Sequence, residues 1–138
     1  MAIPFRINKI LTQQFATFPD LWVNGEKIVV KSEFNFGVNK QLTSVRCVSK
    51  YNYMQNEQML LTTEIACYFD ISEEGSKELT QQGKLSVDFL RYMATIVTGT
   101  ARGIISAKTE GTVLNSIVLP PINLVEAIKT DFIFEVKK

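Results

Sequence analysis

Apolar and polar residues alternate along four segments in the first half of the chain. These segments cover residues 5–18, 27–36, 43–53 and 59–71. In the last and clearest one, Thr63 is the exception on a face that otherwise carries Met59, Leu61, Ile65, Cys67, Phe69 and Ile71. A period of two predicts an antiparallel sheet with one buried and one solvated face. Because short turns separate the segments, we expect a four-stranded meander.

The first of these segments alternates less regularly than the others. Its apolar face is interrupted by Lys9 and Gln13 and is formed by Phe5, Ile7, Leu11 and Phe15. The Asn24-Gly25 pair that follows is typical of a turn that closes a β-hairpin. In a meander this turn would place the first strand beside the second.

The hydrophobic period becomes helical in the second half of the chain. Residues 77–84 are polar and are expected to form a loop. After Ser86, apolar and small residues recur at spacings of three and four: Phe89, Leu90, Met93, Val97, Thr100, Ala101, Ile104 and Ile105. This spacing predicts an amphipathic helix that runs to about residue 107. Ser86 is the expected N-cap, and Asp88 suits the first turn.

Two glycines, Gly99 and Gly103, lie inside this predicted helix, in line with Thr95. Each glycine costs about 1 kcal/mol relative to alanine. One interpretation is a kink or a frayed turn. The other is a close-packed seam between subunits, for which Thr95, Gly99 and Gly103 are the candidate interface residues. On the second interpretation we expect a homo-oligomer, at least a dimer.

A second, C-terminal helix is expected after an extended stretch at residues 113–121, which ends in two prolines. Asn123 followed by Glu126 resembles a capping box, so the helix should begin there. Its buried stripe would consist of Leu124, Ala127, Ile128 and Phe132. Residues 130–136 also alternate like a strand, and both assignments remain open for this tail.

The amino-acid composition excludes several classes of function. The chain has 138 residues, no His, two Cys, and 15 Lys+Arg against 14 Asp+Glu. This length fits a single domain over residues 1–138. Without His, a Ser-His-Asp or Cys-His site is impossible and the commonest metal ligand is missing. The formal charge of +1 argues against nucleic acid as a partner.

Motifs for chemistry are also missing from the sequence. There is no phosphate-binding loop, dinucleotide fingerprint or nucleophile elbow. Glu73 and Glu74 are interpreted as solvated charges in a turn. The basic residues of the wet sheet face alternate with Glu33 and favour solubility: Lys27, Lys31, Arg46 and Lys50. We therefore expect no enzyme activity, no catalytic residue, no metal and no cofactor.

The chain start lacks the apolar run of a secretion signal, and nowhere do 18 apolar residues follow one another. We therefore expect a cytoplasmic protein without membrane insertion. Cys47 and Cys67 stand alone in predicted strands, without CxxC spacing. The preferred interpretation is two buried small apolar residues, and a disulfide or a reactive thiol is the alternative.

Aromatic residues concentrate in the predicted strands. Most are expected in the core: Phe34, Phe36, Tyr51, Tyr53, Tyr68 and Phe69. However, the sheet carries more apolar positions than two helices can cover. Some of them should therefore line a groove or a subunit contact.

The order of features at residues 90–124 resembles the SecB protein-export chaperone family. A helix with Ala101-Arg102 and Ile104-Ile105 is followed by Gly111-Thr112 and by Ile117-Val118-Leu119. The run Pro120-Pro121-Ile122-Asn123-Leu124 is similar to the family's Leu-x-Pro-Val-Asn-Phe segment, which opens the last helix. Tyr68-Phe69-Asp70-Ile71 is similar to the ending of the family's fourth strand.

The resemblance implies an α+β fold, in which a four-stranded antiparallel sheet is followed by a long helix, a crossover stretch and a second helix. It implies an ATP-independent holdase that assembles as a dimer of dimers and binds unfolded or extended polypeptides in apolar grooves. In the family the groove lies between the sheet and the stretch connecting the helices. Its lining here would be Phe34, Phe36, Tyr51, Tyr53, Ile117 and Leu119.

One departure changes the expected partner. The family presents an acidic sheet face to the motor SecA, whereas lysines mark the presumed wet face here. Docking to SecA is therefore not expected, and an antitoxin client, as in SecB-like proteins of toxin–antitoxin pairs, stays open. The alternatives are an adaptor of the same fold that binds one folded partner, and a small-molecule-binding domain or an enzyme that uses Asp, Glu or Lys.

Overall fold

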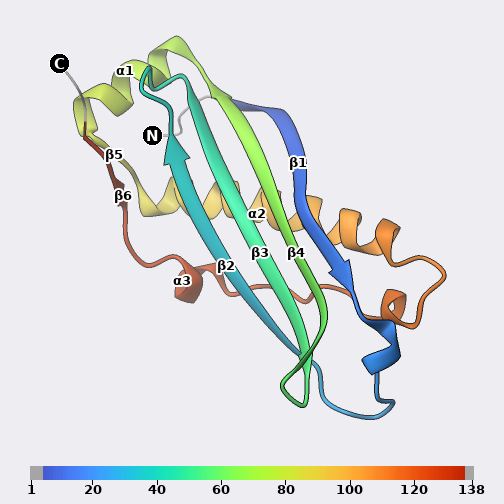
Figure 1. The fold of residues 1–138 in the computed structure, drawn as a ribbon. Coiled ribbons are helices and arrows are strands. Elements are labelled where there is room, and N and C mark those ends of the chain that lie inside the picture. The colour runs from blue at the N-terminus through green and yellow to red at the C-terminus, as the bar shows by residue number, and fades with distance from the viewer. Residues whose placement is uncertain (1–4, 136–138) are drawn as a thin grey trace.

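The computed structural model describes residues 5–135 and has an α+β fold, as expected (Figure 1). The elements in chain order are β1 (Phe5–Thr17), the 3-10 turn η1 (Pro19–Leu21), β2 (Val29–Val38), β3 (Ser44–Gln55), β4 (Gln58–Ile71), α1 (Glu73–Gln82), β5 (Lys84–Leu85), α2 (Val87–Lys108), the 3-10 turn η2 (Val113–Ser116), α3 (Leu124–Ala127) and β6 (Phe132–Ile133). The four strands lie close to the segments that the alternation predicts.

The order of the strands in the sheet corrects the predicted meander. The order is β1-β4-β3-β2, with all neighbours antiparallel, so β1 pairs with β4 and not with β2. β4 is buried on both faces, at Thr62 and Ala66 on one side and Leu61 and Ile65 on the other. A strand of this kind needs a central position, and β1 supplies its second neighbour.

The connection that carries the chain from β1 across to β2 is held by Gln55, at the end of β3. The Gln55 side chain is buried, accepts a hydrogen bond from the Val23 main-chain N–H at 2.9 Å, and donates to the carbonyls of Val23 at 2.9 Å and Glu26 at 3.1 Å. Gly25 lies in this connection with φ +85°, so the Asn24-Gly25 turn exists. It does not close a hairpin, because the strands on either side of it are not paired.

Two irregularities in β1 correct the predicted face of that strand. The register shifts between Ile7 and Lys9 and again between Thr12 and Gln14, which leaves Asn8 and Gln13 as extra residues. Each bulge reverses the alternation. Consequently Ile10 lies opposite Cys67, whereas Leu11 lies opposite Ala66 on the other face of the sheet.

Residues 77–84 were expected to form a loop, but most of them belong to α1. The Ser72 hydroxyl accepts a hydrogen bond from the Gly75 N–H at 3.0 Å, and Glu73 and Glu74 lie in the first turn. Gly83 ends the helix in the left-handed conformation, with φ 65°. Leu79 is the one large side chain that α1 buries, so the sequence gives almost no helical hydrophobic period here.

α2 agrees with its prediction and runs without a break through both glycines. The Ser86 hydroxyl accepts from the Phe89 N–H at 3.2 Å, as an N-cap. Its buried side faces the sheet and consists of Phe89, Leu90, Met93, Ala94, Val97, Thr98, Ala101 and Ile105.

The C-terminal part of the chain differs most from expectation. The predicted second helix is the single turn α3, capped at Asn123, whose side chain accepts from the Glu126 N–H at 3.3 Å. Ile128 is buried, but Ala127 is exposed and Phe132 lies in β6, which pairs antiparallel with β5. For residues 130–136, the sequence left helix and strand open, and the structure has a strand at Phe132–Ile133. Residue 136 lies outside the described residues.

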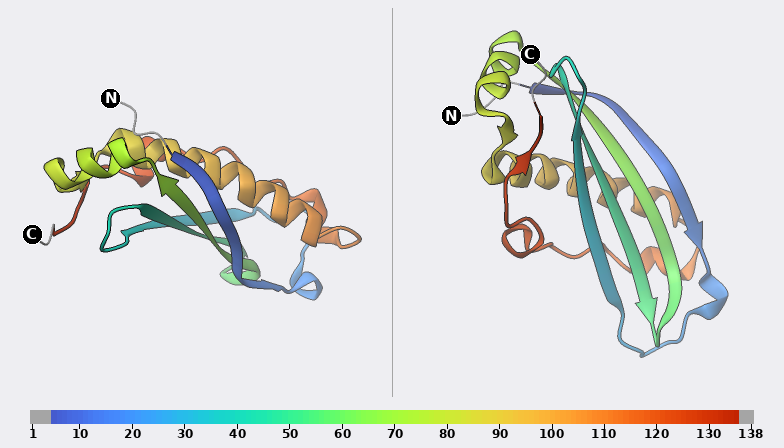
Figure 2. Two further views of the ribbon diagram at one scale, coloured as in Figure 1. Left: turned by 90° about the horizontal axis from the view of Figure 1, so that it is seen from above. Right: turned by 60° about the vertical axis from the view of Figure 1, so that its left-hand side comes forward.

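The elements form two layers. α2 crosses one face of the sheet obliquely, and the chain after it runs back beside α2 on the same face (Figures 1 and 2). Neither covers the opposite face, which we call the outer face and which carries Lys31, Glu33, Arg46 and Lys50. The core lies between the sheet and α2.

Candidate functional site

The chain that runs back beside α2 is the central feature of the candidate site, and we call residues 117–128 the return segment. Two arginines of α2 hold it by its carbonyls. Arg102 donates from Nε to Leu119 O at 2.9 Å and from Nη2 to Pro120 O at 3.5 Å. Arg91 donates from Nε to Ile128 O at 3.0 Å and from Nη2 to Val125 O at 3.3 Å. The segment is therefore fastened to the helix at two places.

Side chains of the return segment alternate between the protein interior and solvent near its start. Leu119 is only 2% exposed, whereas its neighbour Val118 is 68% exposed. Ile117, Ile122 and Leu124 are half-buried against the core. The first part of the segment thus lies on the protein as an extended strand would.

The predicted groove lining divides into two groups in the structure. Phe34 and Phe36 of β2 and Ile117 of the return segment are half-buried and reachable from solvent. Tyr51, Tyr53 and Leu119 are enclosed in the core of the single chain. Phe34 and Tyr51 pack edge to face, with ring centroids 6.3 Å apart. A polypeptide could touch the enclosed group only if the elements that cover it moved.

Tyr53 is exceptional among the described residues, because its hydroxyl is the only buried side-chain polar atom without a hydrogen-bond partner. Burial raises the pKa of Tyr53 to about 12, with a smaller contribution from Tyr51, and the nearby charge of Arg102 acts in the opposite direction. The hydroxyl is therefore neutral and unpaired close to the arginine that holds the return segment.

A cavity of about 390 Å³ brings together residues that the sequence assigned to different sites. It is lined by Gly99, Arg102, Gly103, Ile105, Ser106, Asn115, Ile117, Val118 and Leu119. A Cβ atom at Gly99 or Gly103 would meet no other atom within 4 Å. The glycines thus face open space rather than a neighbour within the chain. Thr95 is also exposed on α2, and its hydroxyl donates to Arg91 O at 2.9 Å.

Exposed apolar side chains gather where β1 meets the start of α2. Ile7 and Ile10 are exposed on the face of β1 that points toward the helices. Tyr92 of α2 is 59% exposed and contacts Phe5 edge to face, with ring centroids 5.6 Å apart. β1 is also an edge strand with one side unpaired. This surface is the second apolar area a partner could cover.

The outer face of the sheet is polar and has basic residues at one end. Arg46 lies over Gly37, next to Tyr68, at a shallow cavity of about 230 Å³. Lys9 lies over the Tyr68 ring, 5.9 Å from its centroid. Elsewhere on this face charges of both signs alternate, as predicted, and Glu33 lies opposite Lys50.

The two thiols are free and buried, directly opposite one another on β3 and β4. Burial raises the pKa of both Cys47 and Cys67, and in Cys47 the neighbouring thiol adds to the rise. Both groups are therefore protonated and unreactive in the folded protein. Their interpretation as small apolar core residues is confirmed.

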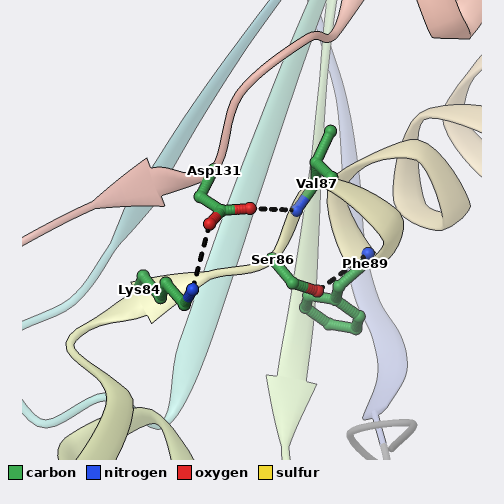
Figure 3. Close-up of polar contacts among 5 residues, drawn as sticks. All are labelled: Lys84, Ser86, Val87, Phe89 and Asp131. Carbon is green, nitrogen blue, oxygen red and sulfur yellow. Dashed lines mark hydrogen bonds and ion pairs between the residues drawn. The ribbon is translucent and has the colours of Figure 1, made fainter.

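The start of α2 is fixed by a residue far along the chain. Asp131 accepts a hydrogen bond from the Val87 N–H at 2.7 Å and one from the Lys84 ammonium at 3.1 Å (Figure 3). Asp131, Arg91 and Arg102 were not singled out as anchors from the sequence. The two arginines are eleven positions apart, about three helical turns, and this spacing on an otherwise apolar helix was the available signal.

The described residues were also searched for a metal site and for a membrane-spanning helix. Residues 5–135 contain no group of three or more His, Cys, Asp or Glu that could hold a metal ion. Among the same residues, no helix combines the length and the hydropathy needed to cross a membrane.

Comparison with known proteins identifies the fold. No protein-family model matches the sequence, and neither does any curated protein. A solved structure does match: the Mycobacterium tuberculosis Rv1957 SecB-like chaperone in complex with a ChAD peptide from the Rv1956 HigA1 antitoxin. The match covers 86% of this chain and 90% of that one, with a TM-score of 0.52 and 15% sequence identity. The chain therefore has the SecB-like fold, as the sequence resemblance implied.

Proposed function

We propose that this protein is an ATP-independent, chaperone-like binding protein that holds extended or non-native polypeptide in an apolar groove on the helical side of the sheet. The observation that carries the proposal is the shared fold with a SecB-like chaperone that was solved with a bound antitoxin peptide. The proposed lining is Phe34, Phe36, Tyr51, Tyr53, Ile117 and Leu119.

The chemistry of these residues suits binding rather than catalysis. Phe34 and Phe36 offer half-buried aromatic surface next to the apolar return segment. Holding an extended chain needs apolar contacts and main-chain hydrogen bonds, and it needs no proton transfer. A protein without His can therefore perform this task.

The client we favour is an apolar segment of an antitoxin, and we place the activity in the cytoplasm. The solved SecB-like structure contains a peptide from an antitoxin, which supports a client of this class. Export through SecA is not proposed, because Lys31, Arg46 and Lys50 lie on the outer face of the sheet. That face lacks the acidic character that the family presents to SecA.

We also propose that the protein acts as a homo-oligomer. The open glycine surface of α2, with Thr95, Gly99 and Gly103, and the exposed apolar side chains of β1 are the candidate contacts. Exposed apolar side chains that lie together, such as those of β1, favour association over exposure to water. Light scattering that gave a monomer at micromolar concentration would contradict this part of the proposal.

The function is tested by the aggregation of a reduced, unfolded model protein in the presence of equimolar purified protein and without ATP. We expect aggregation to be slowed, and to be slowed less by Phe34→Ser. Asn35→Ser is the matched control, because Asn35 is exposed on the neighbouring position of β2. If the unmodified protein leaves aggregation unchanged, the chaperone proposal is wrong.

A second candidate is an adaptor of the same fold that binds one folded partner. The enclosure of Tyr51, Tyr53 and Leu119 favours it, because a groove that is closed in the single chain offers little surface to unfolded clients. An affinity pull-down dominated by one stoichiometric folded protein, without unfolded clients, would support the adaptor over the chaperone.

A further inference from the structure

The first part of the return segment, residues 117–122, is held in an unusual way. The main-chain N–H groups of Val118, Leu119 and Ile122 donate to no acceptor among the described residues, and Pro120 and Pro121 have no N–H to donate. No strand pairs with this stretch. Apart from the Ile117 N–H, which donates to Leu114 O at 3.0 Å, the described hydrogen bonds of its main chain are made by carbonyls, to Arg102. Such contacts do not depend on the side chains of the segment they hold.

The side chains of this stretch resemble those of an extended apolar ligand. Leu119 is enclosed and Val118 is exposed, so alternate residues point toward and away from the protein. The flanking cavity of about 390 Å³ shows that residues 117–119 only partly fill the space beside α2. The glycines at positions 99 and 103 keep that space open.

A buried polar group near Arg102 lacks a hydrogen-bond partner. The Tyr53 hydroxyl is enclosed without a partner, although buried polar groups are normally hydrogen-bonded. Nearby, the Arg102 side chain is already engaged with the carbonyls of Leu119 and Pro120. A buried hydroxyl without a partner and a main chain with unpaired N–H groups therefore both lie near Arg102, as expected where another segment can take the place of residues 117–122.

Both ends of the stretch are anchored independently of its middle. Before it, Asn115 donates from Nδ2 to Ser106 O at 2.8 Å and to the Thr109 hydroxyl at 3.2 Å. After it, Arg91 holds Val125 and Ile128, and Asp131 holds the N-terminus of α2. The middle can therefore leave the surface while the chain on either side stays in place.

We propose that residues 117–122 are an internal occupant of the polypeptide-binding groove, which an extended aliphatic segment of another chain displaces by placing a leucine-sized side chain where Leu119 lies and its carbonyls on Arg102. This inference rests on the proposed function and adds both its regulation and its ligand class, with Ile117 and Leu119 lining the groove only while it is closed. The groove is closed in the absence of ligand, so affinity is reduced by the fraction of molecules that are open.

The test uses a synthetic peptide with the sequence of residues 116–123 and two variants of the full-length protein. Leu119→Ser removes the enclosed side chain of the internal occupant, and Val118→Ser changes its exposed neighbour by a similar amount. We expect the peptide to bind Leu119→Ser at least about tenfold more tightly than the unmodified protein, because the groove is emptied. Val118→Ser should bind as the unmodified protein does. A peptide with Ser in place of its leucine should not bind the emptied groove.

The outcomes separate this proposal from the function on which it rests. If Leu119→Ser binds the peptide no more tightly than the unmodified protein, or more weakly, Leu119 is an ordinary part of the lining and the internal occupant is ruled out. That result leaves the proposed function intact as long as the unmodified protein slows aggregation. If no protein form slows aggregation or binds peptide, the proposed function and the internal occupant both fail. Leu119→Ala, checked by circular dichroism, replaces the serine variant if that variant does not fold.

Discussion

Asp131 and Val87 are joined by a hydrogen bond of 2.7 Å that ties the C-terminal tail to the first turn of the long helix. Ser86 already caps this helix at the Phe89 N–H, so Asp131 is a second cap, supplied from 44 residues away. It also receives a hydrogen bond from Lys84, next to the short β5–β6 pair. One carboxylate thus fastens the chain that follows the return segment to the start of α2.

The pH dependence of stability should reflect this carboxylate. The pKa of Asp131 is lowered below its ordinary 3.8, chiefly because the Val87 N–H donates to it and further because Lys84 does. A lowered pKa in the folded state stabilises the protein fully above the unfolded pKa, and the stabilisation is lost as the pH falls through the folded pKa. We expect Asp131→Asn to lower the melting temperature at neutral pH, and the difference to close as the pH falls through the lowered pKa of Asp131. Asp20→Asn, at an exposed position, should show no such difference.

Substitutions at the glycines of α2 should affect the stability of the folded chain and its self-association in opposite directions. Because an added Cβ meets nothing within 4 Å, Gly99→Ala and Gly103→Ala should each stabilise the folded chain by about 1 kcal/mol in thermal unfolding. If this surface is a subunit contact, the same changes should weaken self-association in light scattering. Unchanged association would remove these residues from the proposed interface. Gly111→Ala, at φ +80°, should destabilise instead.

The crossing connection between β1 and β2 should depend on Gln55. Its buried side chain makes three hydrogen bonds to main-chain groups of Val23 and Glu26. We expect Gln55→Ala to lower the free energy of unfolding in urea by about 2 kcal/mol. The loss is no larger because some of the main-chain groups that Gln55 binds can form hydrogen bonds with water instead. Gln58→Ala, at an exposed position three residues later, should change it little. Equal effects of the two changes would show that the side-chain bonds do not hold the connection.

The two thiols should react with an alkylating reagent only when the protein is unfolded. Cys47 and Cys67 are enclosed, and burial raises the pKa of both. Iodoacetamide at about pH 8 should therefore leave the native protein unmodified and should alkylate both thiols in denaturant. Rapid alkylation of the native protein, followed by mass spectrometry, would contradict the described core.

The sequence predicted those features of the fold that depend on neighbouring residues. The alternation at residues 59–71 and the cap at Ser86 are local signals, and both are confirmed. The place of β1 beside β4 depends on contacts between distant segments, which no local pattern records. Its face at Leu11 was misassigned because two bulges interrupt the alternation. α1 was missed because Leu79 is its only large buried side chain.

The sequence indicated which residues lie on the side of the candidate site, but not which of them are buried. The aromatic residues of β2 and β3 and the apolar return segment do lie on the same side of the sheet. The burial of Leu119 depends on how Arg102 positions the return segment, and this position cannot be predicted from hydropathy. Arg91, Arg102 and Asp131 bind main-chain groups. Because every residue has such groups, no particular side chain in the sequence indicates the partner.

The place of β1 in the sheet has a consequence for how the protein is made. During synthesis β1 leaves the ribosome first, and its partner β4 follows only after β2 and β3, which takes several seconds at roughly 5–20 residues per second. β2, β3 and β4 can pair as soon as each is complete, whereas Phe5 must wait for Ile71. For that time β1 is an extended chain with exposed Ile7 and Ile10 and no partner. During synthesis β1 is therefore, for a time, the kind of unpaired apolar segment that we propose the finished protein binds.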